Sequence, residues 1–212
     1  MVNAYNIVDK QIISPLNKNS YTIILDAGHG GEDGGASCNG VIEKDINLSI
    51  TKKLYNLLIV SGVDVKLTRD SDVSIHDEGK KTLRSKKASD LNNRLKIANS
   101  SNKNILISIH QNKFEDSKYN GAQIFYSAKN EKSKEIASRI QNSIVTAVQP
   151  ENKREIKPAG KNIYLLYNSS VPALIIECGF LSNANEAKKL SDEEYQKKLA
   201  FAIYCGLMDY MK

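Results

Sequence analysis

His29 and His110 are the histidines best placed to do chemistry in this chain. His29 stands in a loop with five glycines that directly follows an apolar run, and His110 closes another apolar run. Apolar runs with β-branched residues predict buried strands. Ligands of α/β sheets bind at the carboxyl ends of such strands, and imidazole is the commonest metal ligand in proteins. Together the two residues therefore favour a metal site over two structural histidines.

Glu43 is the candidate for a third ligand. A catalytic zinc takes three protein ligands, often two imidazoles and a glutamate, and keeps an open position. Glu43 follows the glycine loop and comes just before a predicted helix, where its carboxylate can turn toward His29. The alternative is that Glu43 only complements the dipole at the helix N-terminus.

Glu177 interrupts the apolar run 173–179, which predicts a buried strand. A carboxylate with little solvent around it has a raised pKa unless a cation lies near. A carboxylate of that kind suits the general base of a zinc hydrolase. The alternative is a buried glutamate that pairs with a structural arginine.

Cys178 offers a rival chemistry, a thiol nucleophile with His29 or His110 as its base. Adjacent strand residues point to opposite faces, so Glu177 and Cys178 are not expected to line one cleft. Free cysteines are most often small buried hydrophobes. His76 lies in a polar stretch and is expected to be a surface histidine.

Periodicity and turn residues predict the elements that must position these side chains. A strand over 22–26, a helix over about 44–62 and a strand over 64–69 make a βαβ unit with a right-handed parallel crossover. The remaining predictions are a polar loop over 70–88, a helix over 91–98, strands over 104–110 and 121–127, a helix over 136–148, a short strand over 164–166, a strand over 173–179, and a final helix that begins at Ser191 with a capping box to Glu194.

This alternation predicts one α/β domain over residues 21–212. We expect a mainly parallel, mixed and twisted sheet with helices on both faces. Residues 1–20 show no strong pattern and no signal-peptide pattern, and are expected to form an N-terminal lead-in. No run approaches the roughly 18 apolar residues of a membrane span.

A formal net charge of +6 favours anionic surroundings such as nucleic acid, anionic lipid or the polymers of a cell wall. The densest basic group, over 80–87, has no aromatic residues among its lysines and arginine, and no nucleic-acid-binding module is recognisable. Nucleic acid is therefore not an expected partner. Three cysteines without CxxC spacing argue against a disulfide framework and against a structural zinc site.

A series of segments carries a family resemblance in its order and spacing. The segments are 25–31 (LDAGHGG), Glu43 with Asn47, 67–70 (LTRD), 91–99 (LNNRLKIAN), 108–112 (SIHQN), 121–126 (GAQIFY) and 172–183 (PALIIECGFLSN). With them, the chain resembles the zinc-dependent N-acetylmuramoyl-L-alanine amidases, the type 3 amidase family, over roughly residues 21–212.

The resemblance implies that His29, Glu43 and His110 hold one Zn²⁺ per chain and that Glu177 is the catalytic glutamate. The family cleaves the amide bond between the lactyl group of N-acetylmuramic acid and the L-alanine of the peptidoglycan stem. In the implied zinc-assisted hydrolysis, Glu177 takes a proton from water and delivers it to the leaving amine.

Asn112, Arg94 and Gly179 are further candidates for contacts with the peptidoglycan substrate. The chain also departs from the family pattern at two positions. Gln111 stands where a small residue is usual, and Gly34 stands where a proline is common. Neither departure removes a zinc ligand.

The compact layout without wall-binding repeats looks most like the CwlD-like sporulation and germination branch, which prepares spore cortex peptidoglycan for muramic-δ-lactam formation. We expect action outside the cytoplasm, on the wall or cortex side of the membrane. Targeting is expected from an N-terminal segment absent from this sequence, from the basic surface, or from a protein partner that also regulates the enzyme. The alternatives are a zinc peptidase or deacetylase acting on another amide, and a partner-regulated, weakly active protein that binds peptidoglycan.

Overall fold

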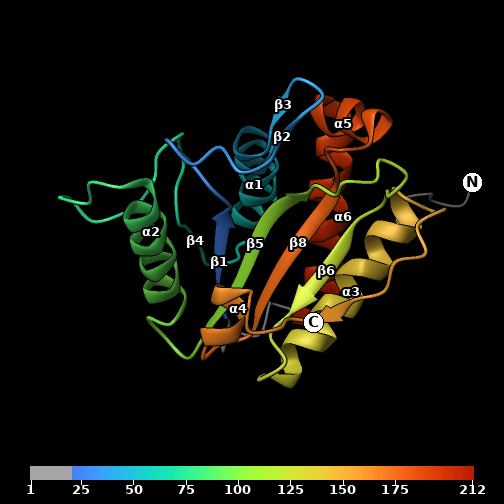
Figure 1. Cartoon of the computed structure of the whole chain (residues 1–212). Coiled ribbons are helices and arrows are strands. Elements are labelled where there is room, and N and C mark those ends of the chain that lie inside the picture. The colour runs from blue at the N-terminus through green and yellow to red at the C-terminus, as the bar shows by residue number, and fades with distance from the viewer. Residues whose placement is uncertain (1–20) are drawn as a thin grey trace, which may run out of the picture.

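A six-stranded mixed sheet organises residues 21–212, the part of the chain that this computed structural model describes (Figure 1). The strands in spatial order are β4 (Val65–Leu67), β1 (Thr22–Ala27), β5 (Asn104–Asn112), β8 (Ala173–Phe180), β6 (Gln123–Tyr126) and β7 (Lys157–Pro158). The first four run parallel, whereas β6 runs antiparallel to β8. The predicted mainly parallel, mixed sheet is therefore confirmed, and the predicted lead-in over 1–20 lies outside the described residues.

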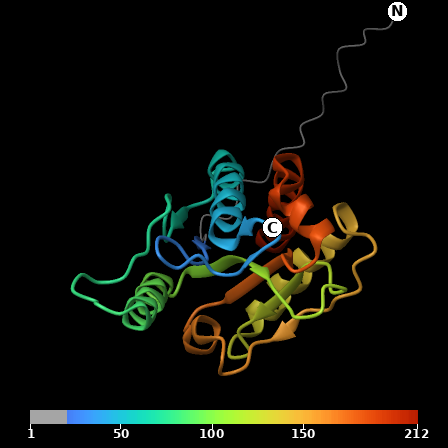
Figure 2. The ribbon, with the colours of Figure 1, turned by 45° about the horizontal axis from the view of Figure 1, so that its top comes forward.

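Helices cover the two faces of the sheet unequally (Figures 1 and 2). One face carries α1 (Glu43–Val60), α3 (Glu131–Ala147) and α6 (Glu193–Met211), and the other carries α2 (Leu83–Ala98) and the short α4 (Tyr164–Asn168). A small hairpin of β2 (Ser37–Cys38) and β3 (Val41–Ile42) precedes α1, and α5 (Ala184–Ser191) follows β8. Within residues 21–212, no helix has the length and apolar character to cross a membrane.

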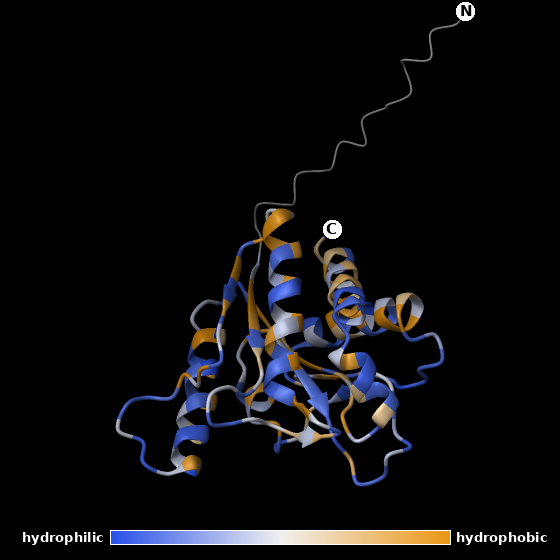
Figure 3. Cartoon of the chain, turned by 90° about the horizontal axis from the view of Figure 1, so that it is seen from above, coloured by the Kyte–Doolittle hydropathy of each residue, from blue (hydrophilic) through white to orange (hydrophobic). Residues whose placement is uncertain are grey.

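The larger core lies between the sheet and the three long helices. Ile46, Ile50, Leu54 and Leu58 recur at helical spacing on α1 and are 4% exposed or less, so this helix forms by burying one apolar stripe. A smaller core on the other face joins Ile24 and its neighbours to α2 and α4. In Figure 3 the apolar residues follow the strands and the inner sides of helices, while the long loops are mostly hydrophilic.

The prediction of a short strand over 164–166 is wrong, because these residues open helix α4. Leu165 and Leu166 bury against the smaller core, and the N–H of Tyr167 donates to the carbonyl of Ile163 in a helical turn. The two leucines pack equally well from a helical turn as from a strand, so an apolar pair alone does not distinguish the two.

The predicted start of the final helix at Ser191 is also wrong. Ser191 ends α5 and bonds back to the carbonyl of Ala187, while Asp192 caps α6 by accepting from the N–H of Tyr195. Both residues are good N-caps, and the sequence alone favoured the wrong one.

Helix α2 begins at Leu83, eight residues before the predicted start. Thr82 and Ser85 form a capping box that satisfies its N-terminus. Its first two turns are polar and lack an apolar stripe, so periodicity gave no signal there.

Asp26, at the end of β1, is the centre of a buried polar network. Its carboxylate is fully buried and accepts hydrogen bonds from the hydroxyls of Thr68 and Ser108 and from Arg94 Nη1. Burial would raise the pKa of Asp26, but the charge of Arg94 and the two hydroxyls outweigh it and hold this pKa at about 2. Arg94 is 1% exposed and also bonds Asp90, one turn earlier on α2. The network therefore fixes α2 to the end of β1.

We predict that Arg94→Met lowers the free energy of unfolding by about 3–5 kcal/mol, because it leaves the Asp26 carboxylate buried without its cation. Urea denaturation measures the change. The control is Arg139→Gln, which removes an exposed arginine that pairs with Glu135 and Asp209 and should cost about 1 kcal/mol or less. Equal, small losses in both variants would contradict this account of the buried pair.

Candidate metal and catalytic site

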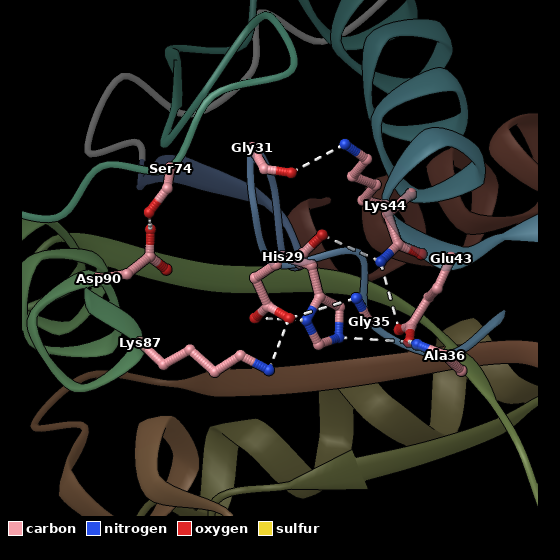
Figure 4. Close-up of polar contacts among 12 residues, drawn as sticks. His29, Gly31, Gly35, Ala36, Glu43, Lys44, Ser74, Lys87 and Asp90 are labelled. Carbon is pink, nitrogen blue, oxygen red and sulfur yellow. Dashed lines mark hydrogen bonds and ion pairs between the residues drawn. The ribbon is translucent and has the colours of Figure 1, made fainter. Parts of the chain in front are cut away.

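The structure brings His29, Glu43 and His110 together at the carboxyl edge of the sheet. Each residue offers one possible metal-ligand atom, and these three atoms lie within 4.8 Å of one another. The three come from the loop after β1, from the first residue of α1 and from β5. Figure 4 shows the side chains of His29 and Glu43 turned toward each other. Residues far apart in sequence thus form one cluster of two imidazoles and a carboxylate.

His29 is held in a left-handed backbone conformation, with φ of 64°. Its Nδ1 lies 2.9 Å from Asp33 Oδ2, and its Nε2 lies 3.3 Å from Glu43 Oε2. Burial would lower the pKa of His29, but the hydrogen bonds to Asp33 and Glu43 raise it to about 9. Lys87 reaches across from α2 and places its Nζ 2.8 Å from Asp33 Oδ1 (Figure 4). Asp33 therefore orients the ring so that Nε2 faces the cluster.

Two buried arginines hold the carbonyl groups of the loop that carries His29. Arg94 donates to the carbonyls of Ala27 and His29, and Arg69 donates to those of Ala27 and Gly28. A loop with so many glycines has little conformational preference of its own. Its shape is therefore imposed by the arginine side chains behind it.

Two glycines of the loop are required for the close approach of the imidazoles. A Cβ at Gly28 would lie 2.3 Å from the ring of His110. A Cβ at Gly35, where φ is +69°, would lie 2.5 Å from Glu43 Oε2 and 2.6 Å from His29 Cδ2. Any side chain at these positions would push the three polar groups apart.

Glu43 is 4% exposed and lies between the two histidines. Its Oε1 is 2.9 Å from His110 Nδ1 and accepts from the N–H of Gln111, and its Oε2 accepts from the N–H of Ala36. Burial would raise the pKa of Glu43, but the hydrogen bonds to His110 and His29 hold it well below its usual range. Glu43 is thus a carboxylate fixed in its ionised form.

Glu177 stands beside His110 on the neighbouring strand, with the two residues in register. Its carboxylate is mostly buried, and among residues 21–212 no donor reaches its buried Oε2. Burial, with a smaller contribution from the charge of Glu43, raises the pKa of Glu177 to about 7 against the opposing effect of the two histidines. No arginine pairs with Glu177 in the described part of the chain, in contrast to the structural alternative. Two glutamates of one site thus differ widely in pKa, which is the pattern of a fixed ligand and a proton carrier.

Cys178 lies on the opposite face of β8, as the strand alternation predicts. It is fully buried in the larger core, and burial raises the pKa of its thiol to about 12. A thiol so buried and so rarely ionised does not serve as a nucleophile.

The three candidates for substrate contacts differ in their surroundings. All five N–H groups of Arg94 are bonded within the protein, so it holds the loop of His29, and a substrate contact by Arg94 stays a prediction. Asn112 is half-buried at the end of β5, on the side of the sheet that carries His110. Gly179 lies where the register between β5 and β8 shifts, and a Cβ there would lie 3.2 Å from Glu186 Oε2. His76 bonds Ser74 in the loop before α2, outside the cluster.

Sequence reasoning missed two supporting residues. Asp33 lies four residues after His29 in the glycine loop, a spacing that would have indicated a hydrogen-bond partner for the ring. Asn47 lies one helical turn after Glu43 and bonds both Glu43 Oε1 and the carbonyl of Gly28. It had been noted only as part of a motif, without a role.

Comparisons with known proteins show the family of the chain. The chain is 38% identical to the germination-specific N-acetylmuramoyl-L-alanine amidase of Bacillus subtilis (strain 168) over 188 residues, which cover 89% of this chain and 78% of that protein. Among solved structures, the CwlD amidase from Clostridioides difficile in complex with the GerS lipoprotein superposes with a TM-score of 0.86 at 49% identity, covering 90% of this chain and 98% of that one.

A second solved structure, an N-acetylmuramoyl-L-alanine amidase from Clostridium difficile 630, superposes with a TM-score of 0.77 at 34% identity and covers 91% of this chain and 97% of that one. Residues 23–209 match the family model described as N-acetylmuramoyl-L-alanine amidase. This chain therefore belongs to the N-acetylmuramoyl-L-alanine amidase family, as its sequence motifs had indicated.

Proposed function

We propose that this enzyme is a zinc-dependent amidase in which His29, Glu43 and His110 hold one Zn²⁺ and Glu177 is the proton carrier. The observation that carries the proposal is the convergence of two imidazoles and a carboxylate within 4.8 Å, next to a carboxylate of raised pKa on the adjoining strand. The substrate bond is the amide between N-acetylmuramic acid and L-alanine of peptidoglycan, as the family name states.

The residues present fit a zinc ion. Nitrogen and oxygen ligands lie about 2.0–2.2 Å from zinc, so two ligands of a tetrahedral site lie about 3.4 Å apart. The 3.3 Å between His29 Nε2 and Glu43 Oε2 matches this spacing. Asp33 supplies the second hydrogen bond that fixes the ring of a zinc-ligating histidine. Three protein ligands leave the open position that catalysis requires.

Glu177 and Glu43 have different roles in the proposed hydrolysis. When bound, Zn²⁺ would polarise the scissile carbonyl and lower the pKa of a water molecule. Glu177 has a pKa near 7, and no donor among residues 21–212 reaches its buried oxygen, so it would take a proton from water and deliver it to the leaving amine of L-alanine. Glu43 stays ionised throughout, because its hydrogen bonds fix it between the histidines.

The similarity to a germination-specific amidase and to CwlD supports a role in the spore. We propose that the enzyme modifies cortex peptidoglycan on the outer side of the cytoplasmic membrane, in the reaction that leads to muramic-δ-lactam. The net charge of +6 suits an anionic wall polymer.

We also propose a regulatory protein partner. The CwlD structure is a complex with the GerS lipoprotein, and the present chain shares 49% of its residues. A three-ligand site with one ligand, His29, on a glycine-rich loop gains zinc affinity when a partner reduces the motion of that loop. With a lipoprotein of the GerS kind from the same cell, we expect tighter zinc binding in a chelator competition titration. Equal zinc affinity with and without the lipoprotein would contradict this regulation.

The function itself is tested by zinc content and product analysis. We expect wild type and Glu177→Ala to hold about one zinc per chain, and only wild type to cleave, because Glu177 moves protons without being a ligand. His110→Ala should lose the metal. Cleavage should expose the amino group of L-alanine and leave the muramyl sugar intact, which a deacetylase would not do.

Two results would contradict these roles. Full zinc in His110→Ala would show that the ligand set is wrong, and full activity in Glu177→Ala would remove the proton carrier. Cortex and vegetative wall serve as matched substrates, and activity on vegetative wall alone would contradict the spore role.

A pH-dependent stability is expected in the zinc-free protein. The pKa of Glu177 is about 7 in the folded protein against an ordinary 4.5, so the folded state binds the proton more tightly than the unfolded state. The free energy of unfolding therefore falls as pH rises from about 4.5 through 7. A glutamine at position 177 does not ionise, so Glu177→Gln should keep its free energy of unfolding as pH rises. We expect it to be more stable than wild type by roughly 1–3 kcal/mol at pH 8, with little difference at pH 4.

Denaturant unfolding with a chelator present, at both pH values, measures the difference. A stability gain of the same size at pH 4 and pH 8 would mean that packing, and not the charge of Glu177, causes it.

A further inference from the structure

We infer that Arg154 forms a subsite for a carboxylate of the stem peptide, on the side of Glu177 from which the peptide leaves. The inference rests on the proposed amidase function and names a specificity residue for it. The ligand is an acidic peptide, with the α-carboxylate of the residue after L-alanine as the group bound.

Arg154 is held rigidly although it belongs to an irregular segment. Its Nε donates to the carbonyl of Asn120 at 2.7 Å and its Nη1 to Gln123 Oε1 at 3.2 Å. The guanidinium lies 4.4 Å from the centre of the Phe180 ring and 5.5 Å from that of Tyr119. Such stacking and hydrogen bonding fix the plane of the group before any ligand arrives.

The guanidinium of Arg154 has more N–H groups than it has acceptors among residues 21–212. Three of its five N–H groups, one on Nη1 and both on Nη2, have no acceptor among residues 21–212. No carboxylate of these residues lies within 4.0 Å of it. The charge of Arg154 acts on the carboxylate of Glu186, but Glu186 accepts from the N–H groups of Gly121 and Phe180. A fixed, half-exposed arginine with a free edge is suited to bidentate binding of a carboxylate.

Strand register places this arginine near the catalytic glutamate. Gln123, the partner of Arg154 Nη1, stands opposite Glu177 on the adjoining strand β6. Adjacent strands lie about 4.8 Å apart. Phe180, under the guanidinium, pairs with Asn112 beyond the register shift and so follows Glu177 toward the carboxyl end of β8. Arg154 therefore contacts the side chain that stands opposite Glu177 on the next strand.

The chemistry of the substrate identifies the group bound. Glu177 delivers its proton to the amine of L-alanine, so the stem peptide leaves on the side of β8, away from His29 on β1. The residue after L-alanine is an acidic one, joined through its side chain, with a free α-carboxylate. Two residues of extended chain span about 7 Å, more than the spacing of adjacent strands, so a peptide that leaves over β8 and β6 runs toward Gln123 and Arg154. The muramyl sugar carries no such charge.

Arg154→Gln is expected to raise KM roughly tenfold on a muramyl disaccharide whose stem has the free α-carboxylate, because a charge-assisted pair is lost. On the same fragment with this carboxylate amidated, KM should not change. Wild type should itself prefer the acidic fragment by a similar factor. Arg154→Lys keeps the positive charge but lacks the paired N–H groups of a guanidinium. It should recover part of the preference for the acidic fragment. Arg139→Gln, on the outer side of α3, is the control and should leave both KM values unchanged.

Equal KM values of wild type on the acidic and the amidated fragment would contradict the proposed subsite. This comparison uses wild type alone, so it does not depend on whether a variant folds. An equal loss on both fragments in Arg154→Gln would also overturn it, by showing that Arg154 only supports Phe180. If wild type hydrolysed neither fragment while holding zinc, the amidase proposal would fail instead.

Discussion

The buried ion pair between Asp26 and Arg94 is the interaction on which the site depends. It lies under the glycine loop, and the same guanidinium that neutralises Asp26 also holds the carbonyl of His29. A glycine-rich loop pays more conformational entropy to become ordered than any other segment. Charged hydrogen bonds to its backbone, with Arg69 as the second donor, supply the order. With the loop so ordered, the bonds to Asp33 and Glu43 can hold the imidazole of His29 in one position.

The unequal covering of the sheet explains where the site is. Three long helices bury one face, whereas α2 and α4 cover only part of the other. His110 and Glu177 point to the less covered face, as does Gln123 on the antiparallel strand. The larger core can therefore stabilise the fold while the smaller one leaves room at the sheet edge for a polymeric substrate.

Two glutamates in one small site have opposite pKa shifts because their surroundings differ. Glu43 lies between two imidazoles and backbone donors, which stabilise its charge. Glu177 lies on an apolar strand, and no donor among residues 21–212 reaches its buried oxygen, so its pKa rises to about 7. Environment, and not residue type, thus separates a carboxylate fixed in its ionised form from one that can gain and lose a proton near pH 7.

Strand alternation and glycine content predicted the class of fold and the core position of Cys178, because they are local signals. The grouping of His29, Glu43 and His110 with Glu177 came from the family motifs, because the residues by themselves left Glu43 and Glu177 open to structural roles. Tertiary structure decided the helical state of 164–168, which depends on core partners distant in sequence. The early start of α2 and the place of Asp192 as cap rest on local caps that periodicity does not reveal. The sequence motifs favour Arg94 over Arg154 for substrate contacts, yet all five N–H groups of Arg94 are bonded within the protein, while three of those of Arg154 have no acceptor among residues 21–212. Which donors remain available is set only when the chain has folded.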